Sequence, residues 1–354
     1  MKKWPDILNS IQPVDISLEE KILNRLDSLT KPKGSLGRLE EIALRYCLIR
    51  GKTEPKLGKK VIYTFAADHG VTTEGVSAFP SEVTVQMVEN MLSGGAAVNV
   101  LARHAGVEVR VIDIGVNDPL KNSDGLIRCK VASGTKNIAQ GPAMTSEQCS
   151  RALDVGIELA TQAAADGVTL IGTGEMGIGN TTPSSALFAA LLPCKVEDIT
   201  GIGTGIDSER LAHKQSVIKQ ALKVNEKDLS DPFRALAALG GFEIAGICGL
   251  ILGAASHRIP IVVDGFISTA GALAALKLCP VVREYLFFSH LSAEAGHIQF
   301  FNQLEIRPLL DMEMRLGEGT GAALAMFMIE AAMKIYMEMA TFDTAGIARK
   351  ISES

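Results

Sequence analysis

Glu318 is the side chain whose neighbours point most directly to acid–base chemistry. It lies in the stretch LGEGTG at 316–321, just before an apolar helical pattern. Flanking glycines leave a carboxylate unshielded and let a planar ligand approach the backbone closely. Met312, Met314 and Leu316 would exclude water from this carboxylate, and desolvation raises the pKa of a carboxyl group and makes it a better base. The alternative is that Glu318 is an acidic residue in the first turn of a helix, where it only interacts favourably with the helix dipole.

A second glutamate, Glu175, lies in a glycine-rich stretch that reads VTLIGTGEMGIGNTTP over residues 168–183. The apolar run predicts a strand. Thr182 and Pro183 then predict a helix start in which the threonine caps the helix and the proline takes its first position. A helix N-terminus entered through a glycine-rich loop favours anions, because unsatisfied N–H groups and the helix dipole both attract negative charge. A phosphate-bearing small molecule is therefore the first hypothesis for the ligand.

A second glycine-rich loop reads TGIGTGID at 200–207 and also precedes a helical pattern. Asp207 is the expected cap of that helix, and Lys214 lies about two turns into it. Neither loop ends in the Gly-Lys-Ser/Thr of a P-loop, and neither gives Gly-x-Gly-x-x-Gly in register. One such loop could be a structural turn. Two loops close together, with a lysine downstream, favour recognition of a phosphate and a ribose.

The histidines raise the alternatives of a metal site and a serine triad. His290 and His297 are seven residues apart with Glu294 between them, and the three could share one helical face. No third ligand of metal-binding spacing is evident, however, and the sequence has no Gly-x-Ser-x-Gly elbow. We therefore expect no metal, and we expect Ser292 to donate a hydrogen bond to a substrate.

The stretch AFPSEV at 78–83 leads into another helical pattern. Ser81 at its start predicts a helix cap. The same arrangement also presents Pro80, Val83 and Glu89 as a wall for a flat apolar ligand, and the two roles do not exclude each other.

These candidate residues must be positioned by short apolar runs that alternate with helical patterns from residue 60 onward. Near-continuous apolar strands between helices predict a parallel sheet covered on both faces. The expected fold class is therefore α/β, a doubly wound and mainly parallel sheet with helices on both faces. The expected strands are Val61–Ala66, Val107–Ile114, Val168–Ile171, Ile259–Val263 and Tyr285–Phe288. The helices expected between them are Ser81–Leu92, Ala96–His104, Ser146–Ala165, Thr182–Leu191, Ser208–Leu222, Phe242–Ala255 and Ser268–Leu278.

Polar and small residues follow each of these runs. Examples are ADHG at 67–70, DG at 264–265 and SHLS at 289–292. Ligands of open parallel sheets bind outside the carboxyl ends of the strands. We therefore expect these ends to converge on one site, although at any single strand they could simply be terminators.

Helical patterns also lie at both ends of the chain. SLEE at 17–20 is a capping box before Lys21–Leu29, Leu36–Ile49 has apolar residues at helical spacing, and Gly321–Met339 is a long apolar pattern. These terminal parts flank the alternating region, so they could pair into one small helical subdomain. The methionines of the last helix are expected to fill the core.

Composition excludes several function classes. Hydrophobic residues make up 47% and charged residues 21% of the 354 residues, and the net charge is −5. These values are typical of a soluble globular protein without a global attraction to nucleic acid or to anionic membranes. The six cysteines are scattered and suit reduced thiols in the cytoplasm. The N-terminus lacks the apolar core of a secretory signal, and Ile244–Ser256 is shorter than the roughly 20 residues of a spanning helix.

Several long motifs together resemble the nicotinate-nucleotide–dimethylbenzimidazole phosphoribosyltransferase family. The resemblance covers nearly the whole chain, through LTKPKGSLGRLE, AADHGV, AFPSEVTVQMV, GGAAVNVLAR, GEMGIGNTT, TGIGTGID, VVDGF, SHLSAEAGH and LGEGTGAALA. It implies a Rossmann-like catalytic domain over 59–305, a small helical domain built from 1–58 and 306–354, and a homodimer. It also implies a reaction in which the 5-phosphoribosyl group of nicotinate mononucleotide moves to 5,6-dimethylbenzimidazole with inversion at C1′. No cofactor and no metal are implied.

The resemblance also assigns roles to particular residues. Glu318 matches the general base of the family, and Glu175 would lie near the ribose and the reacting centre. The phosphate would be held by Gly177, Asn180, Thr181, Gly203, Gly205 and Lys214. Asp264, Gly265 and Ser292 would bind the ribose or the nicotinate, and the benzimidazole would contact Pro80, Ser81, Val83, Glu89, Met176 and Leu316.

Two alternatives remain open at this stage. A nicotinamide-dependent dehydrogenase is disfavoured because AADHG stands at 66–70, where a glycine fingerprint would follow the first strand. A catalytically silent nucleotide- or base-binding protein is disfavoured because Glu318 and both glycine loops are intact. Within the favoured class, adenine, phenolic bases or other benzimidazoles could also serve as acceptors.

Overall fold

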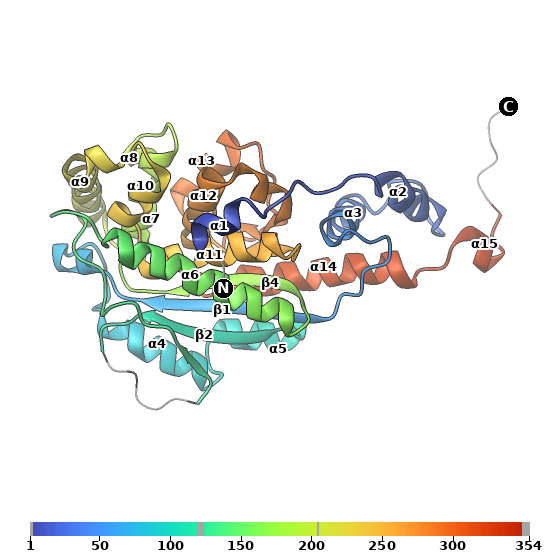
Figure 1. Cartoon of the computed structure of the whole chain (residues 1–354), viewed down its shortest axis with the longest axis horizontal. Helices are drawn as coiled ribbons and strands as arrows, with labels where there is room; N and C mark the ends of the chain where they lie inside the picture. Colours follow the sequence, from blue (N-terminus) through green and yellow to red (C-terminus); the bar gives the residue numbers. More distant parts are fainter. Residues whose placement is uncertain (1–2, 119, 121–123, 204, 349–354) are drawn as a thin grey trace.

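A single parallel sheet of six strands forms the centre of the computed structural model (Figure 1). The structure describes residues 3–118, 120, 124–203 and 205–348. The strand order is β3-β2-β1-β4-β5-β6, and every neighbouring pair is parallel. The strands are β1 (Lys59–Ala67), β2 (Glu108–Gly115), β3 (Leu126–Arg128), β4 (Val168–Met176), β5 (Ile261–Val263) and β6 (Leu286–Phe288), and β7 (His290–Leu291) pairs with β8 (Leu310–Asp311) in a separate two-stranded sheet.

Helices cover both faces of the sheet, as the apolar character of the strands predicted. One face carries α4 (Glu82–Leu92), α5 (Ala97–Ala105) and α14 (Thr320–Glu338), and the other carries α6 (Ser146–Ala165), α11 (Phe242–Ser256) and α12 (Phe266–Leu278). The expected doubly wound α/β class is confirmed. The remaining helices are α1 (Trp4–Leu8), α2 (Glu19–Ser28), α3 (Arg38–Arg50), α7 (Thr181–Leu191), α8 (Val196–Ile199), α9 (Ser208–Val224), α10 (Pro232–Leu239), α13 (Ala295–Gln303) and α15 (Phe342–Ala345). Three 3-10 turns are η1 (Gly70–Glu74), η2 (Glu226–Asp228) and η3 (Pro280–Tyr285).

The strand order reverses direction between β1 and β4. From β1 the chain proceeds outward to β2 and β3, and it then crosses over to β4, β5 and β6 on the other side. Ligands of doubly wound sheets bind at such a switch point, beyond the carboxyl ends of the strands. Phe65 of β1 is paired with Glu175 of β4 there, so one candidate side chain already lies at this position.

Strand β4 is longer than the sequence predicted. It continues from Val168 through Gly172 and Gly174 to Met176, whereas the glycines had suggested a loop after Ile171. The glycines stay in the strand because other elements approach it closely. A Cβ on Gly172 would lie 2.8 Å from Met326 Cε, and one on Gly174 would lie 2.4 Å from the carbonyl oxygen of Glu318. Glu175 is therefore presented by a strand rather than by a loop.

Segments from both ends of the chain lie side by side away from the sheet. Helices α2 and α3 pack along the C-terminal part of α14, at the right of Figure 1. Arg25 donates hydrogen bonds to the carbonyls of Tyr336 and Met337, both at 3.0 Å, and Thr30 N–H donates to Ala340 O at 3.0 Å. In contrast, α1 packs on α6 and α11 of the main body, where Trp4 stacks on Phe233 at 4.6 Å.

Three of the expected helix caps, at Ser17, Ser81 and Thr182, are wrong. Ser17 bonds to Asp15 instead of capping a helix, and α2 begins at Glu19. Thr182 is the second residue of α7 and is fully buried, and Pro183 is the third, because the chain turns into the helix at Asn180. The cap expected at Asp207 is confirmed, since its carboxylate accepts a hydrogen bond from Arg210 N–H at 2.9 Å.

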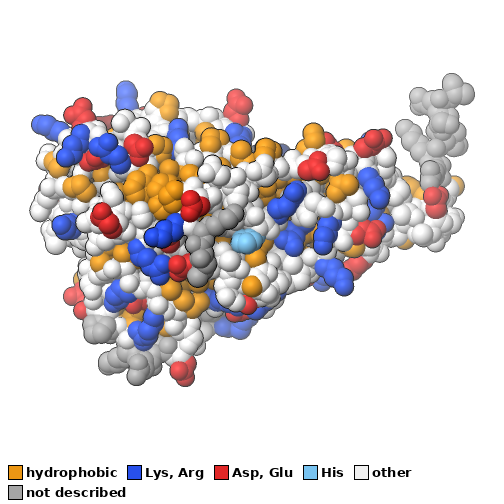
Figure 2. All heavy atoms as spheres, in the orientation of Figure 1, with side chains coloured by type: hydrophobic (Ala, Val, Ile, Leu, Met, Phe, Trp, Pro, Cys, Tyr) orange, Lys and Arg blue, Asp and Glu red, His pale blue; other side chains and the backbone are white. Residues whose placement is uncertain are grey.

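The molecular surface agrees with the modest net charge. Figure 2 shows acidic and basic side chains interspersed with uncharged ones over this face. Helix α14 is long and apolar enough to cross a membrane by length and composition, but more than half of it is buried inside the protein. It is therefore a helix of the protein core.

Candidate active site

A cavity of about 280 Å³ lies at the carboxyl ends of the central strands. Ten of the residues expected from the sequence line it: Glu175, Met176, Gly177, Asn180, Thr181, Gly203, Gly265, Ser292, Leu316 and Glu318. They come from the end of β4, both glycine loops, the start of α12, the segment after β7 and the segment before α14. The ends of β4, β5 and β6 therefore converge on one site as expected, but the residues that directly follow β1 and β2 do not line it, and Gly70 lines a different hollow.

The segment Leu316–Gly319, here called the collar, has an unusual backbone. Gly317, Glu318 and Gly319 have φ values of +81°, +64° and +101°. Such values are rare for a residue with a side chain, and in native proteins this strain is often found at functional sites. The collar is fixed from below, because Thr64 Oγ1 donates a hydrogen bond to Glu318 O at 3.0 Å and Gly174 leaves room for that carbonyl.

Asp264 fixes the collar from the other side. Its carboxylate accepts hydrogen bonds from the N–H groups of Gly319 and Ala322, both at 2.9 Å. These are orphan donors at the start of α14, so Asp264 caps a helix that begins more than fifty residues later. Asp264 does not itself line the cavity, and the structure uses it to position the loop that carries Glu318.

The carboxyl group of Glu318 is desolvated and lacks a partner. The residue is only 4% exposed, and Oε2 forms no hydrogen bond with any described residue. Burial, followed by the nearby charge of Asp264, raises the pKa of Glu318 from 4.5 to about 7. Of the three residues expected to exclude water from this carboxylate, Leu316 lines the cavity, whereas Met312 and Met314 do not, and Met312 is more than half exposed.

Glu175 is held more firmly than Glu318. Asn180 Nδ2 donates a hydrogen bond to its Oε2 at 2.5 Å, and the backbone N–H of Glu318 also donates to this carboxylate. A Cβ on Gly317 would lie 2.2 Å from Glu175 Oε1, so the glycine lets the collar close over the carboxylate. Burial, with smaller effects of Asp264 and Glu243, raises the pKa of Glu175 to about 8.

The second glycine loop, Thr200–Asp207, is anchored by Lys214 of α9. Lys214 is 1% exposed, and Nζ donates hydrogen bonds to Thr181 Oγ1 at 2.8 Å and to Gly201 O at 3.2 Å. Burial lowers the pKa of Lys214 to about 8, although the charge of Glu294 opposes this shift. The lysine therefore ties this loop to the N-terminus of α7, where backbone N–H groups favour an anion.

The residues expected around a flat base are only partly brought together. Met176 and Leu316 line the cavity. Pro80, Ser81 and Val83 do not line it, although they follow the lining residue Phe79 closely in the sequence. Ser81 Oγ is 3.2 Å from Thr72 Oγ1 and does not cap α4.

Two further expected residues lie outside the cavity. Glu89 lines a separate hollow with Leu92, Ser93 and Asp124. Gly205 of the second glycine loop has a φ of +101° and open space around its Cβ position.

The histidines do not share a helical face. His290 is in β7 and His297 is in α13. His297 uses both ring nitrogens: Nδ1 accepts from Ser292 N–H at 2.9 Å, and Nε2 bonds to Thr269 Oγ1 at 2.9 Å. Over the part of the chain that the structure describes, no group of three or more His, Cys, Asp or Glu side chains could hold a metal ion.

Eight lining residues were not assigned to the substrate site from the sequence. They are Phe79, Ile178, Phe266, Ile267, His290, Glu294, Arg315 and Gly317. Each is next to, or two residues from, a residue that was assigned or discussed, so proximity in the motifs was the available signal. Proximity in the motifs could not reveal the role of Arg315. Its Nη1 donates a hydrogen bond to Gly203 O at 2.8 Å and so joins two loops that are distant in the sequence.

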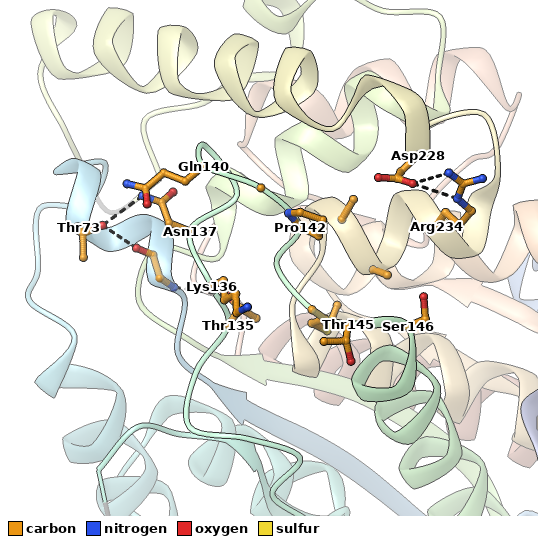
Figure 3. Close-up of a pocket in the computed structure, with 15 residues that line it drawn as sticks. Thr73, Thr135, Lys136, Asn137, Gln140, Pro142, Thr145, Ser146, Asp228 and Arg234 are labelled. Carbon is orange, nitrogen blue, oxygen red and sulfur yellow. Dashed lines mark hydrogen bonds and ion pairs between the residues drawn. The ribbon is translucent and has the colours of Figure 1, made fainter.

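A larger hollow of about 880 Å³ lies elsewhere, between η1, the loop at 135–146 and α10 (Figure 3). Its prominent charged pair, Asp228 with Arg234, is already joined by hydrogen bonds of 2.5 and 3.0 Å. None of the expected site residues lines it. The smaller cavity, with its buried and unpaired carboxylate, is therefore the candidate active site.

Comparisons with known proteins show the family of the chain. A phosphoribosyltransferase family model matches residues 11–347. The chain is similar to nicotinate-nucleotide–dimethylbenzimidazole phosphoribosyltransferases of Chlorobaculum tepidum (58% identity over 98% of this chain and 99% of the relative) and of Pelodictyon phaeoclathratiforme (60% identity over 98% of each). The crystal structure of CobT from Thermus thermophilus is similar at 46% identity, with a TM-score of 0.88 over 94% of this chain and 99% of that one. The chain belongs to the nicotinate-nucleotide–dimethylbenzimidazole phosphoribosyltransferase family.

Proposed function

We propose that this chain transfers the 5-phosphoribosyl group of nicotinate mononucleotide to 5,6-dimethylbenzimidazole, giving α-ribazole 5′-phosphate and nicotinate in cobalamin biosynthesis. The names of the relatives support this activity. The observation that carries the proposal is the position of Glu318, whose unpaired and desolvated carboxyl group lies in one cavity with Gly177 and Gly203 of the two glycine loops.

The reaction needs one proton acceptor. A benzimidazole nitrogen attacks C1′ of the ribose, the bond from C1′ to the pyridinium nitrogen breaks, and its electron pair leaves with nicotinate. The new bond would leave the benzimidazole cationic unless its other ring nitrogen loses a proton. Glu318 takes this proton, and a pKa of about 7 suits a base that works near neutral pH.

Positioning supplies the rest of the rate. Holding the two rings in line on opposite sides of C1′ replaces a bimolecular encounter with a preorganised one, and the pyridinium is already a cationic leaving group. Glu175, fixed by Asn180, orients the ribose next to the reacting carbon. Asp264 contributes to catalysis indirectly. Its carboxylate accepts hydrogen bonds from the N–H groups of Gly319 and Ala322 and so fixes the backbone of the collar.

Different parts of the cavity bind the different substrate groups. The phosphate binds near Lys214, Thr181 and the N-terminus of α7, where a cation and backbone donors are close together. Gly177, Asn180, Gly203 and Gly205 complete that site. Gly265 and Ser292 bind the nicotinate side. The base binds against Met176 and Leu316, with Pro80, Ser81, Val83 and Glu89 on the adjoining loop and helix.

Incubation with nicotinate mononucleotide and a panel of bases tests the activity. Chromatography should detect free nicotinate that depends on the added base, with 5,6-dimethylbenzimidazole, adenine and phenol as separate arms. Base-independent release of nicotinate, or no release with any base, would contradict the transferase proposal. The arm with the highest kcat/KM identifies the preferred acceptor.

We also propose that the enzyme works as a homodimer in the cytoplasm. The dimer follows from the family resemblance, and the cytoplasmic location is supported by six cysteines that are all free thiols. Sedimentation velocity at micromolar concentration should give about twice the chain mass of 37.6 kDa, and a species of single-chain mass would contradict the dimer.

A further inference from the structure

His290 lines the candidate active site, and both of its ring nitrogens are buried without a hydrogen-bond partner among the described residues, whereas Glu318 and Glu294 each leave one carboxylate oxygen unpaired there. His290 is 1% exposed. Buried polar groups in native proteins are nearly always paired, so an exception calls for a reason. Because the ring lines the cavity, the missing partner can come from a bound ligand.

His297, a few residues later, shows that this is not the rule for the region. Its Nδ1 accepts from Ser292 N–H and its Nε2 bonds to Thr269 Oγ1, so its role is to hold the loop. The His290 ring is fixed by shape alone. It meets the His297 ring edge-on at 6.3 Å, and a Cβ on Gly321 would lie 2.2 Å from its Cδ2. The protein therefore places an imidazole firmly and leaves both nitrogens available.

The groups around His290 favour an anion. Gly265 is the N-cap of the thirteen-residue helix α12, and a Cβ there would be 3.5 Å from His290 Nε2. The start of α12 has no side-chain cap among the described residues, so its N–H groups and the helix dipole favour negative charge. Ser292 Oγ accepts from Glu294 N–H at 3.3 Å, which leaves its own proton to donate.

The neighbouring carboxylate does not fill this position. Asp264 interacts electrostatically with His290, but its two oxygens accept hydrogen bonds from Gly319 and Ala322. The site thus offers two places for an anion, one at the N-terminus of α7, where Lys214 lies behind the lining residue Thr181, and one at His290. Nicotinate mononucleotide carries two separate anionic groups, a phosphate and a pyridine carboxylate.

We propose that His290 donates a hydrogen bond to the carboxylate of the nicotinate leaving group and thereby selects nicotinate mononucleotide over its neutral carboxamide analogue. This inference rests on the proposed function. A neutral carboxamide lacks the negative charge that the imidazole and the α12 N-terminus attract. The enzyme would therefore distinguish the two phosphoribosyl donors by the group on their pyridine ring.

The test compares H290F and H290Q with the unaltered enzyme, using nicotinate mononucleotide and nicotinamide mononucleotide as donors. H290F, which keeps an aromatic ring of similar size, should lower kcat/KM for the acidic donor roughly 10- to 100-fold, the effect of one hydrogen bond to a charged group. The carboxamide donor should change less than about threefold, so the donor preference collapses. H290Q keeps a neutral N–H group that can donate a hydrogen bond. Its kcat/KM for nicotinate mononucleotide should therefore lie between the values of H290F and the unaltered enzyme. H104Q, on the exposed face of α5, is the control and should keep the parental preference.

Binding of free nicotinate gives an independent measurement. Calorimetry should show an affinity for nicotinate that H290F loses by a similar factor, at an unchanged melting temperature. An unchanged donor preference in H290F, or an equal loss with both donors, would overturn the role of His290. No turnover by the unaltered enzyme with any base would instead contradict the proposed function, and the nicotinate titration would still test His290.

Discussion

The two ends of the cavity are built in opposite ways. At the second glycine loop the buried charge is paired: Lys214 Nζ donates hydrogen bonds to Thr181 Oγ1 and to Gly201 O, and Arg315 ties in Gly203 O. At the collar the buried charge is left open, because Glu318 Oε2 has no partner in the described part of the chain. The buried charged group at the second glycine loop therefore has hydrogen-bond partners before a ligand binds, and the one at the collar does not.

This difference separates anchoring from chemistry. A paired cation on a helix can hold a phosphate without reorganising, whereas a base must have a free lone pair at the position where the proton appears. The unpaired end is possible because the structure supports it indirectly. Asp264, Thr64 and Gly174 fix the backbone around Glu318, so the carboxylate remains in place without using its own oxygens.

Glu318→Gln is the strongest way to break the comparison. Removal of the proton acceptor should lower kcat roughly 10²–10⁴-fold, while the dissociation constant of nicotinate mononucleotide changes little because the anchoring end is intact. Stopped assays and calorimetry measure the two effects. The exposed Glu313, three residues before the collar, provides the control, and E313Q should behave like the unaltered enzyme.

The pH profile gives the same prediction a second measurement. Because burial raises the pKa of Glu318 to about 7, the base is protonated and inactive below that pH. The rate of the unaltered enzyme should therefore rise with pH through about 7, and E318Q should lack this limb. A kcat in E318Q that equals the parental value would reject the assignment of the base.

Gly317→Ala tests whether the collar depends on backbone shape. A Cβ at this position would lie 2.2 Å from Glu175 Oε1, and the residue has a φ of +81°. The left-handed conformation and the overlap together should cost roughly 2–5 kcal/mol of unfolding free energy, with a parallel loss of kcat. Gly34 has a similar φ of +73° and nothing within 4 Å. G34A should therefore lose only the conformational part, and equal melting temperatures of the two variants would contradict the packing argument.

The sheet and the location of the site could be predicted from the sequence, because they depend on local patterns. Apolar runs gave β1 and β2 to within two residues, and the polar residues after the runs marked the ligand end of the sheet. Strand β3 was missed because it is only three residues long and half-buried at the sheet edge, so it has no apolar run to detect.

The state of the individual side chains could not be predicted. The left-handed backbone of Glu318 depends on β4, more than 140 residues earlier, and the cap of α14 comes from Asp264. Long-range contacts of this kind leave no periodic signal. The domain boundaries near 58 and 306 remain a prediction, and α1 packs on the main body, so the terminal segments do not all lie in the helical part.

Lys214→Ala tests the anchoring end. Loss of a buried cation from the phosphate site should raise KM for nicotinate mononucleotide roughly 10- to 100-fold, while kcat changes less than about threefold. Lys219 on the same helix forms an exposed ion pair with Glu197, so K219A should leave both constants unchanged. A loss of kcat at an unaltered KM in K214A would assign the lysine to the reacting end and remove the contrast between the two ends.

Glu175→Gln gives the smallest effect, on stability, and sharpens the comparison within the reacting end. The pKa of Glu175 rises from 4.5 to about 8 on folding, so the folded chain binds a proton that the unfolded chain releases. The resulting stability is complete below pH 4.5 and is lost as the pH rises through 8. Glutamine is neutral throughout. E175Q should therefore melt at nearly the same temperature as the parent at pH 5 and a few degrees higher at pH 8.5, as thermal unfolding can measure. A difference that does not grow with pH would mean that Asn180 and the Glu318 N–H compensate the buried charge fully, and Glu175 would then belong with Lys214 among the paired groups.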